Sequence, residues 1–253
     1  MNLPPELIDE IVRNLAFDIR SLRSCSLIAR SWAYSSRKWL FKDVLVSRKT
    51  HQLWLDRIAP TNVELLRNIQ TFTYLFDTIS MWHGTKPCLT PYHIDSLCSY
   101  LPSFRRLERL RLHYMLLGPE VPQQIGLFSA VQHSLSSLYL SDCLVTSNAL
   151  ITLVNYLPLL VDLELRYLRH EANGEPAPQL SRPLRGRLCI AYCETEDRAL
   201  FGTLSNPPPE LDELVLFQVH LLTFYDCIVG ARGGNVKRLI MNGSKVSGPE
   251  GES

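Results

Sequence analysis

The stretch LSSLYLSDC, residues 135–143, decides the fold of this 253-residue chain. Its leucines follow the pattern apolar-x-x-apolar-x-apolar, in which alternate side chains of a short strand enter a core, and a cysteine stands three positions after the last leucine. The same pattern recurs along the chain, and its central apolar residues are Phe72, Leu110, Leu138, Leu163, Leu188, Leu214 and Leu239. From Leu110 onward these residues lie 25 to 28 positions apart, which is a repeat period typical of a solenoid.

Two stretches between the copies predict helices. Residues 93–102 (HIDSLCSYLP) and 150–158 (LITLVNYLP) have apolar residues at helical spacing and end in Leu-Pro, which stops a helix before the next strand. Each repeat is therefore expected to be a short strand plus a helix, with parallel strands stacked into an arc. The copy around Leu188 has Arg185 in its first apolar position. We expect an insertion at 81–91, a loop at 170–187 and a disordered tail at 243–253.

This period, together with Cys143 and Cys193 after their strands, resembles irregular leucine-rich repeats. In such an arc the strands line the concave face, and the side chains between the leucines point away from the core. Stacking the copies predicts a row that begins basic, becomes hydroxyl-rich and then acidic, and ends apolar. The candidate substrate-binding residues of this row are Arg109, Arg111, His113, Tyr139, Asp162, Glu164, Arg166 and Phe217. A mixed row favours a protein or peptide ligand over nucleic acid, and a solvated face without a ligand is the alternative.

Helical periodicity replaces the repeat near the N-terminus. In residues 3–15 (LPPELIDEIVRNL) the apolar residues recur at i, i+3 and i+4, and the helix is expected to begin near Pro5. Asp18 is expected to cap a second helix with an apolar seam at 22–32, and a short third helix is expected at 39–41. Three such short helices bury little surface, so the module needs a partner or a neighbouring domain.

The order of residues in this module resembles an F-box. The positions that carry the resemblance are Leu3-Pro4, Leu7-Ile8, Ile11, Asp18, Leu22, Arg30-Ser31-Trp32 and Trp39-Leu40-Phe41. Ala16 departs from it, because many members have a proline there. With the repeats that follow, the chain is similar to many predicted fungal F-box proteins.

The resemblance implies a three-helix module that docks on a Skp-type adaptor, and through it on a cullin scaffold with a RING subunit. It further implies that the adaptor interface, or the small core behind it, is formed by Leu3, Pro4, Leu7, Ile8, Ile11, Leu22 and Trp32. A bundle whose seams only face one another is the alternative. The expected fold is an α+β solenoid, with an F-box at 1–47, a leucine-rich-repeat-like domain at 48–242 and the tail at 243–253.

Composition excludes several classes of protein. Lys and Arg number 26 against 25 Asp and Glu, so the net charge of +1 provides no sequence-wide field for nucleic acid or an anionic membrane. The seven scattered cysteines indicate reduced thiols and an intracellular protein, in the cytoplasm, the nucleus or both. No secretory signal is visible, and the longest apolar stretch, 149–161, is interrupted and too short to span a membrane.

No pattern typical of catalysis or of cofactor binding occurs. Phosphate-binding and nucleophile motifs are absent from the sequence. His83, Cys88, His93 and Cys98 recur every five residues, but structural zinc sites favour gaps of two to four residues between paired ligands. The sequence therefore predicts no metal site, no cofactor and no catalytic residue.

Three functions remain open from sequence. The first is a substrate-recognition subunit of a ubiquitin ligase, which supplies proximity to an unknown protein substrate and has no catalytic residue of its own. The second is a non-catalytic scaffolding solenoid whose F-box-like helices act only as an N-terminal cap. The third is an enzyme with an undetected site.

Overall fold

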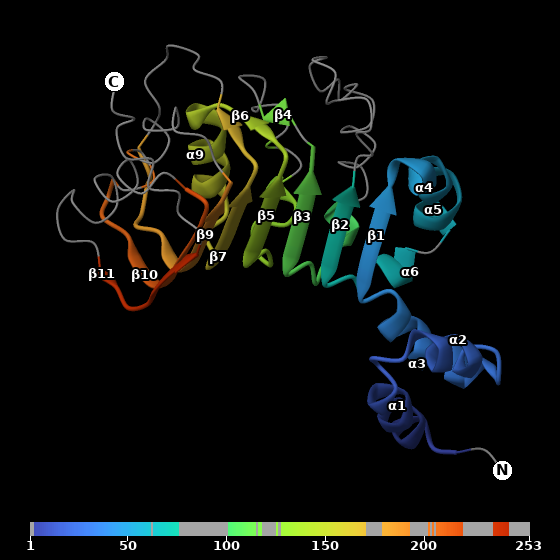
Figure 1. The fold of residues 1–253 in the computed structure, drawn as a ribbon. Helices are drawn as coiled ribbons and strands as arrows, with labels where there is room; N and C mark the ends of the chain where they lie inside the picture. The colour runs from blue at the N-terminus through green and yellow to red at the C-terminus, as the bar shows by residue number, and fades with distance from the viewer. Residues whose placement is uncertain are drawn as a thin grey trace, which may run out of the picture.

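A computed structural model shows an N-terminal helical region followed by a parallel sheet (Figure 1). It describes residues 3–61, 63–75, 101–114, 116–117, 125, 128–170, 179–192, 202, 204, 206–219 and 235–242. The expected insertion at 81–91, most of the expected helix at 93–102, the tail at 243–253 and the residues His83, Cys88, His93 and Cys98 lie outside the described residues. No helix in the described ranges has the length and apolarity needed to cross a lipid bilayer.

The N-terminal region consists of α1 (Pro5–Asn14), α2 (Ile19–Cys25) and α3 (Arg30–Leu40). The predicted start near Pro5 is confirmed, because a proline in the first turn loses no helical hydrogen bond. The predicted cap is also confirmed, since the Asp18 carboxylate accepts hydrogen bonds from the backbone N–H groups of Arg20 (3.0 Å) and Ser21 (3.2 Å). The first backbone N–H groups of a helix have no carbonyl partner within the helix, and the Asp18 carboxylate provides one for α2.

The predicted boundary between the second and third helices is wrong. The chain leaves the helical path after Cys25, and Trp32 and Trp39 lie together on α3. The hydroxyls of Ser24 and Ser26 donate to the carbonyls of Arg20 and Arg23 at the end of α2. Such side-chain bonds compete with a continuing helix, which gives a physical reason for the break.

The three helices have a small core of their own. Ile8 and Val12 of α1 and Leu22 of α2 are buried in it. Partly buried side chains that pack against it are Leu15, Trp32, Trp39 and Leu40. This cluster is separate from the large core under the sheet.

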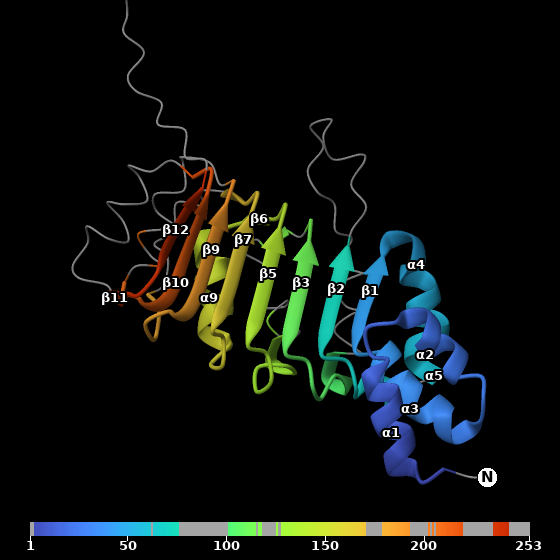
Figure 2. The same cartoon turned by 60° about the horizontal axis from the view of Figure 1, so that its bottom comes forward.

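Within the described residues the sheet has nine strands, all parallel. They are β1 (Asp43–Ser47), β2 (Thr71–Leu75), β3 (Arg109–His113), β5 (Ser137–Ser141), β7 (Asp162–Arg166), β9 (Arg185–Ala191), β10 (Glu210–Phe217), β11 (Asn235–Val236) and β12 (Leu239–Asn242). Figure 2 shows them side by side in a gently turning row.

The strand register aligns the repeat found in the sequence. The central residues pair in one line across the sheet, in the order Phe72, Leu110, Leu138, Leu163, Leu188, Leu214 and Leu239. Val44 of β1 pairs with Phe72 and adds a strand at the start of this line, inside the segment 1–47. The parallel arc of short strands and helices is compatible with leucine-rich repeats.

Helical turns and short strands connect the members of the sheet. Between β1 and β2 lie α4 (Arg48–Leu53), the π-helix η1 (Trp54–Ile58), α5 (Ala59–Thr61) and α6 (Val63–Leu66). A 3₁₀ turn, η3 (Leu101–Ser103), precedes β3, and α9 (Ser147–Tyr156) lies between β5 and β7, where a helix was predicted. A second, three-stranded sheet consists of the two-residue strands β4 (Leu116–Leu117), β6 (Leu144–Val145) and β8 (Arg169–His170).

The predicted loop at 170–187 is wrong at both ends, since His170 belongs to the short strand β8, and residues 171–178 lie outside the described residues. Arg185, Gly186 and Arg187 belong to β9, and the backbone N–H of Arg187 donates to the carbonyl of Val161 at 2.7 Å. Arg185 is exposed, whereas Leu184 is buried in the large core. The pairing with neighbouring strands therefore overrides the Pro-, Gly- and charge-rich composition of this segment.

Candidate functional site

The predicted adaptor-binding residues divide into an exposed and a buried set. Leu3, Leu7 and Ile11 keep 44%, 47% and 40% of their surface exposed, and Pro4 is also exposed. Ile8 and Leu22 are instead members of the small core, and Trp32 packs half-buried against it. The first set is available to a partner, and the second holds the three helices together.

Exposed apolar side chains that the sequence analysis did not single out add to this surface. Phe17, Ile19, Leu27 and Ile28 all lie exposed, with Phe17 at 101%. They belong to the turns between the helices and to the first residue of α2, so helical periodicity could not reveal them. We define the helical apolar surface as Leu3, Leu7, Ile11, Phe17, Ile19, Leu27 and Ile28. Seven large apolar side chains exposed within residues 3–28 make this region a candidate interaction surface.

A polar contact fixes the packing of α1 on α3. The hydroxyl of Ser35 donates a hydrogen bond to a carboxylate oxygen of Asp9. Ser35 is itself buried, so this bond gives its hydroxyl a hydrogen-bond partner between the helices. It therefore helps to set the orientation of the helix that carries Leu7 and Ile11.

The predicted concave row does lie on one face of neighbouring strands. Arg109 aligns with Ser137 and Asp162, and Arg111 aligns with Tyr139 and Glu164. His113 occupies the same line as Ser141, Arg166, Ala191 and Phe217. Alternation along each strand sends these side chains to the face opposite the core leucines.

Tyr139 is the centre of an aromatic and cationic cluster on this face. Guanidinium carbons of Arg111 and Arg166 lie 5.9 Å and 5.7 Å from its ring centroid. The imidazole of His113 lies 5.1 Å from the same ring, centroid to centroid. Burial lowers the pKa of His113, while nearby Asp142 opposes and Arg111 adds to that effect. The ring is therefore contacted by two cations and by an imidazole that favours its neutral form.

An ion-pair network occupies the next part of the face. Arg187 lies 3.1 Å from Asp162, 3.3 Å from Glu164 and 3.7 Å from Glu213, measured between side-chain nitrogen and oxygen atoms. Arg166 pairs with Glu164 at 2.5 Å. Farther along, Arg238 pairs with Glu213 at 3.3 Å, and Ser137 donates to Asp162 at 3.0 Å. We call Asp162, Glu164, Arg166, Arg187, Glu213 and Arg238 the concave ion-pair network.

The network divides the predicted substrate-binding residues into two kinds. Asp162, Glu164 and Arg166 already have charged partners within the protein. Arg109 and Arg111 have no ion pair among the described residues, and they line a hollow of about 330 Å³ over β1, β2 and β3. The hollow also contains Asp43 and Leu45, and Leu45 is exposed. The beginning of the face is therefore freer to bind a ligand than its centre.

The cysteine on this face is not a reactive thiol. Cys189 is a buried free cysteine, and its pKa is raised to about 11. Burial is the main cause, and the carboxylate of Glu164 adds to it. The thiol is therefore protonated at neutral pH, whereas a nucleophile requires the thiolate.

Neither a comparison with protein-family models nor one with curated proteins finds a match for this chain. Within the described ranges, no group of three or more His, Cys, Asp and Glu side chains could hold a metal ion. The candidate site therefore consists of two surfaces, the helical apolar surface and the sheet face that carries the predicted concave row, which we call the concave face.

Proposed function

We propose that this chain is a substrate-recognition subunit of a cullin-RING ubiquitin ligase. The helices α1 to α3 form an F-box that docks on a Skp-type adaptor, and the concave face of the arc binds a protein substrate. The observation that carries the proposal is the helical apolar surface, which lies on a module with a small core of its own.

Burial of this surface gives a partner its binding energy. Full burial of one Leu, Ile or Phe side chain contributes roughly 1.5–3 kcal/mol. Leu3, Leu7 and Ile11 are already a little more than half buried, so each has only part of this energy left to contribute. Phe17, Ile19, Leu27 and Ile28 must add to it for the interface to offset the losses of association. The buried residues Ile8, Val12 and Leu22 keep the helices in place beneath it.

In this function the protein contributes proximity. An adaptor at one end and a substrate on the concave face are held in one assembly, which raises the effective concentration of a substrate lysine near the charged ubiquitin carrier. The bond-forming chemistry belongs to the partners of the chain.

A role of the three helices as a mere cap is less well supported. The first strands are covered by the segment after β1, where Trp54 lies 6.1 Å from Phe72 between ring centroids and Leu66 is buried in the large core. The cluster formed by Ile8, Val12 and Leu22 is separate from that core. A cap would be expected to join the core that it closes.

The test is co-purification with a Skp-type adaptor. A Leu3→Ala, Leu7→Ala, Ile11→Ala variant should lose the complex, because three exposed apolar contacts are removed without touching the small core. A matched control is Leu53→Ala, Leu159→Ala, Val161→Ala, which removes equally exposed side chains from the repeat domain and should still bind. Circular dichroism checks that both variants fold. Native protein that is folded and yet fails to bind the adaptor contradicts the proposal.

A further inference from the structure

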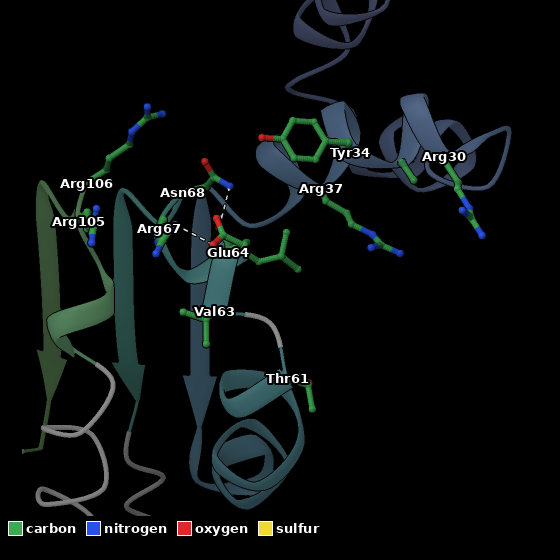
Figure 3. A pocket seen from close by; sticks show the side chains of 12 residues that line it. Arg30, Tyr34, Arg37, Thr61, Val63, Glu64, Arg67, Asn68, Arg105 and Arg106 are labelled. Atoms are coloured by element: carbon green, nitrogen blue, oxygen red, sulfur yellow. Dashed lines mark hydrogen bonds and ion pairs between the residues drawn. The ribbon is translucent and has the colours of Figure 1, made fainter. Parts of the chain in front are cut away.

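An open groove of about 990 Å³ lies between α3 and the turns that lead into β2 and β3 (Figure 3). One wall is α3, with Arg30 and Arg37, and the opposite wall is the turn before β3, with Arg105 and Arg106. Arg67, which directly follows α6, lies between the two walls. We call this the junction groove, because residues of the helical region and of the repeat domain meet in it.

The junction groove concentrates positive charge in a chain that is nearly neutral overall. Five arginines line it, and Glu64 is the one acidic residue among the lining residues. Glu64 pairs with Arg67 at 2.7 Å, so its charge is already matched. Arg30, Arg37, Arg105 and Arg106 have no ion pair among the described residues. The whole chain carries a net charge of only +1, so this excess is local.

The chemistry of the lining indicates what can fill the groove. Every cation in it is an arginine, whose planar guanidinium binds a carboxylate through two parallel hydrogen bonds. An anionic ligand in the groove can make charge-assisted hydrogen bonds to guanidiniums of both walls. The volume is near the upper end of the roughly 300–1,000 Å³ of small-molecule pockets, and the groove is open, which suits a segment of chain.

We propose that the junction groove binds a carboxylate-rich segment of a partner protein, which lies between α3 and the turn before β3. Charge complementarity favours such a segment. A nucleic acid is disfavoured because the near-neutral chain offers no wider basic field to follow its backbone, and Glu64 lies within the groove.

This inference goes beyond the proposed function, because the junction groove includes neither the helical apolar surface nor the concave face. A segment that contacts both walls also ties the helical region to the repeat domain. It would therefore limit the movement of one relative to the other while it is bound.

The experiment measures fluorescence anisotropy of a labelled peptide of alternating Glu and Gly, with the full chain at low ionic strength. The same peptide with Gln in place of Glu should bind at least about tenfold more weakly, since it lacks the charge. Arg37→Gln together with Arg106→Gln removes one cation from each wall and should weaken binding of the Glu peptide by about tenfold. The matched control is Arg20→Gln with Arg23→Gln, which removes the same net charge from exposed positions on α2 and should change binding by no more than about twofold.

Three results would overturn the inference. Equal binding of the Glu and Gln peptides would show that carboxylates are not recognised. Equal losses in the two double variants would show that net charge alone attracts the peptide. Tighter binding of a labelled single-stranded oligothymidylate than of the Glu peptide would assign the groove to nucleic acid.

The same proteins separate this inference from the proposed function. The Leu3→Ala, Leu7→Ala, Ile11→Ala variant should bind the Glu peptide like the native chain, and the Arg37→Gln, Arg106→Gln variant should bind the adaptor like the native chain. Loss of peptide binding in the leucine and isoleucine variant would contradict an independent groove.

Discussion

The strands of the arc end in residues with an unusual backbone. Tyr114, Asp142, Tyr167, Tyr192 and Gln218 each follow a strand, and each has φ between 46° and 62°. Their backbone N–H groups donate to the carbonyl of the last residue in the neighbouring strand, as from Tyr114 to Ser141 at 2.9 Å. A left-handed backbone costs roughly 1–2 kcal/mol for a residue other than glycine, and this bond helps to offset it. The sheet thus extends its hydrogen bonding by one residue at each exit turn.

Gly186 is the described glycine whose backbone conformation is demanding. Its φ is +76°, and a Cβ built on it would lie 2.2 Å from the carbonyl oxygen of Val161. That oxygen accepts the N–H of Arg187, so moving it disturbs the pairing of β9 with β7. Gly186→Ala should therefore lower the free energy of unfolding by about 2–4 kcal/mol, measured by urea denaturation.

Gly202→Ala is the matched control for this change. A Cβ at Gly202 would meet nothing within 4 Å, and the glycine lies exposed in a helix. Its stability should stay the same or rise slightly, since alanine favours helix. A Gly186→Ala protein as stable as Gly202→Ala would contradict the close approach at β9.

His113 should make stability depend on pH. Burial places its folded-state pKa below the ordinary value of 6.5, so the unfolded chain binds a proton more readily. Its contribution to stability is therefore complete above pH 6.5 and is lost as the pH falls toward the lowered pKa. Denaturation across this range should show a flatter pH dependence for His113→Gln than for the native chain. Parallel curves would show that His113 titrates as it does in the unfolded chain.

At the scale of the element, β7, β9 and β10 are tied together by charge as well as by backbone bonds. Arg187 of β9 is 35% exposed, and it lies between Glu164 of β7 and Glu213 of β10, which are 16% and 18% exposed. Arg187→Met should destabilise the protein by about 1–2 kcal/mol, because it leaves partly buried carboxylates facing one another. Thermal unfolding at several salt concentrations measures the loss.

Arg185→Met tests whether position on the sheet matters. Arg185 lies on the same strand, and its only described ion pair is with Glu210 at 3.1 Å, with both side chains mostly exposed. Its removal should change stability by less than about 0.5 kcal/mol. Equal effects of the two substitutions would mean that the concave ion-pair network contributes no more than a surface pair.

At the scale of the whole molecule, the chain contains two separate hydrophobic clusters. Leu22 belongs to the small cluster of the helices, and Leu138 belongs to the large one under the sheet. A Leu→Ala change at either position removes a fully buried side chain, with an expected loss of about 2–5 kcal/mol. The three-helix module is small, so Leu22→Ala should unfold it. After Leu138→Ala, the strands next to β5 should keep the large core folded.

Hydrogen exchange measured by mass spectrometry distinguishes the two effects. Leu22→Ala should remove the protection of peptides from α1, α2 and α3 and leave β5 and β7 protected. Leu138→Ala should weaken protection around β5 and leave the helices unchanged. Loss of protection throughout the chain in both variants would show that the two clusters unfold together.

Much of the arc could be predicted because its signal is local and repeated. The spacing of the leucines set the register of the sheet, and the Leu-Pro before β7 marked the end of α9. Two predictions failed. Arg185 to Arg187 became strand through pairing with β10, and Arg187 also pairs with β7, so contacts between distant residues decided the backbone there. The boundary between α2 and α3 lies before Arg30, so that Trp32 belongs to α3, and serine side chains bond to backbone carbonyls at the end of α2.

The sequence by itself determined the period of the repeat, the alternation of buried and open side chains on each strand, and the start of the first helix. These features follow from local backbone geometry, because side chains repeat their direction every two residues in a strand and every 3.6 residues in a helix. Only the tertiary structure decided which apolar side chains of the helices stay exposed, how Arg187 meets Asp162, Glu164 and Glu213, and that Arg37 and Arg106 share one groove. Those contacts join residues that are far apart in the chain, so they arise from how the repeats stack and where α3 leads into β1.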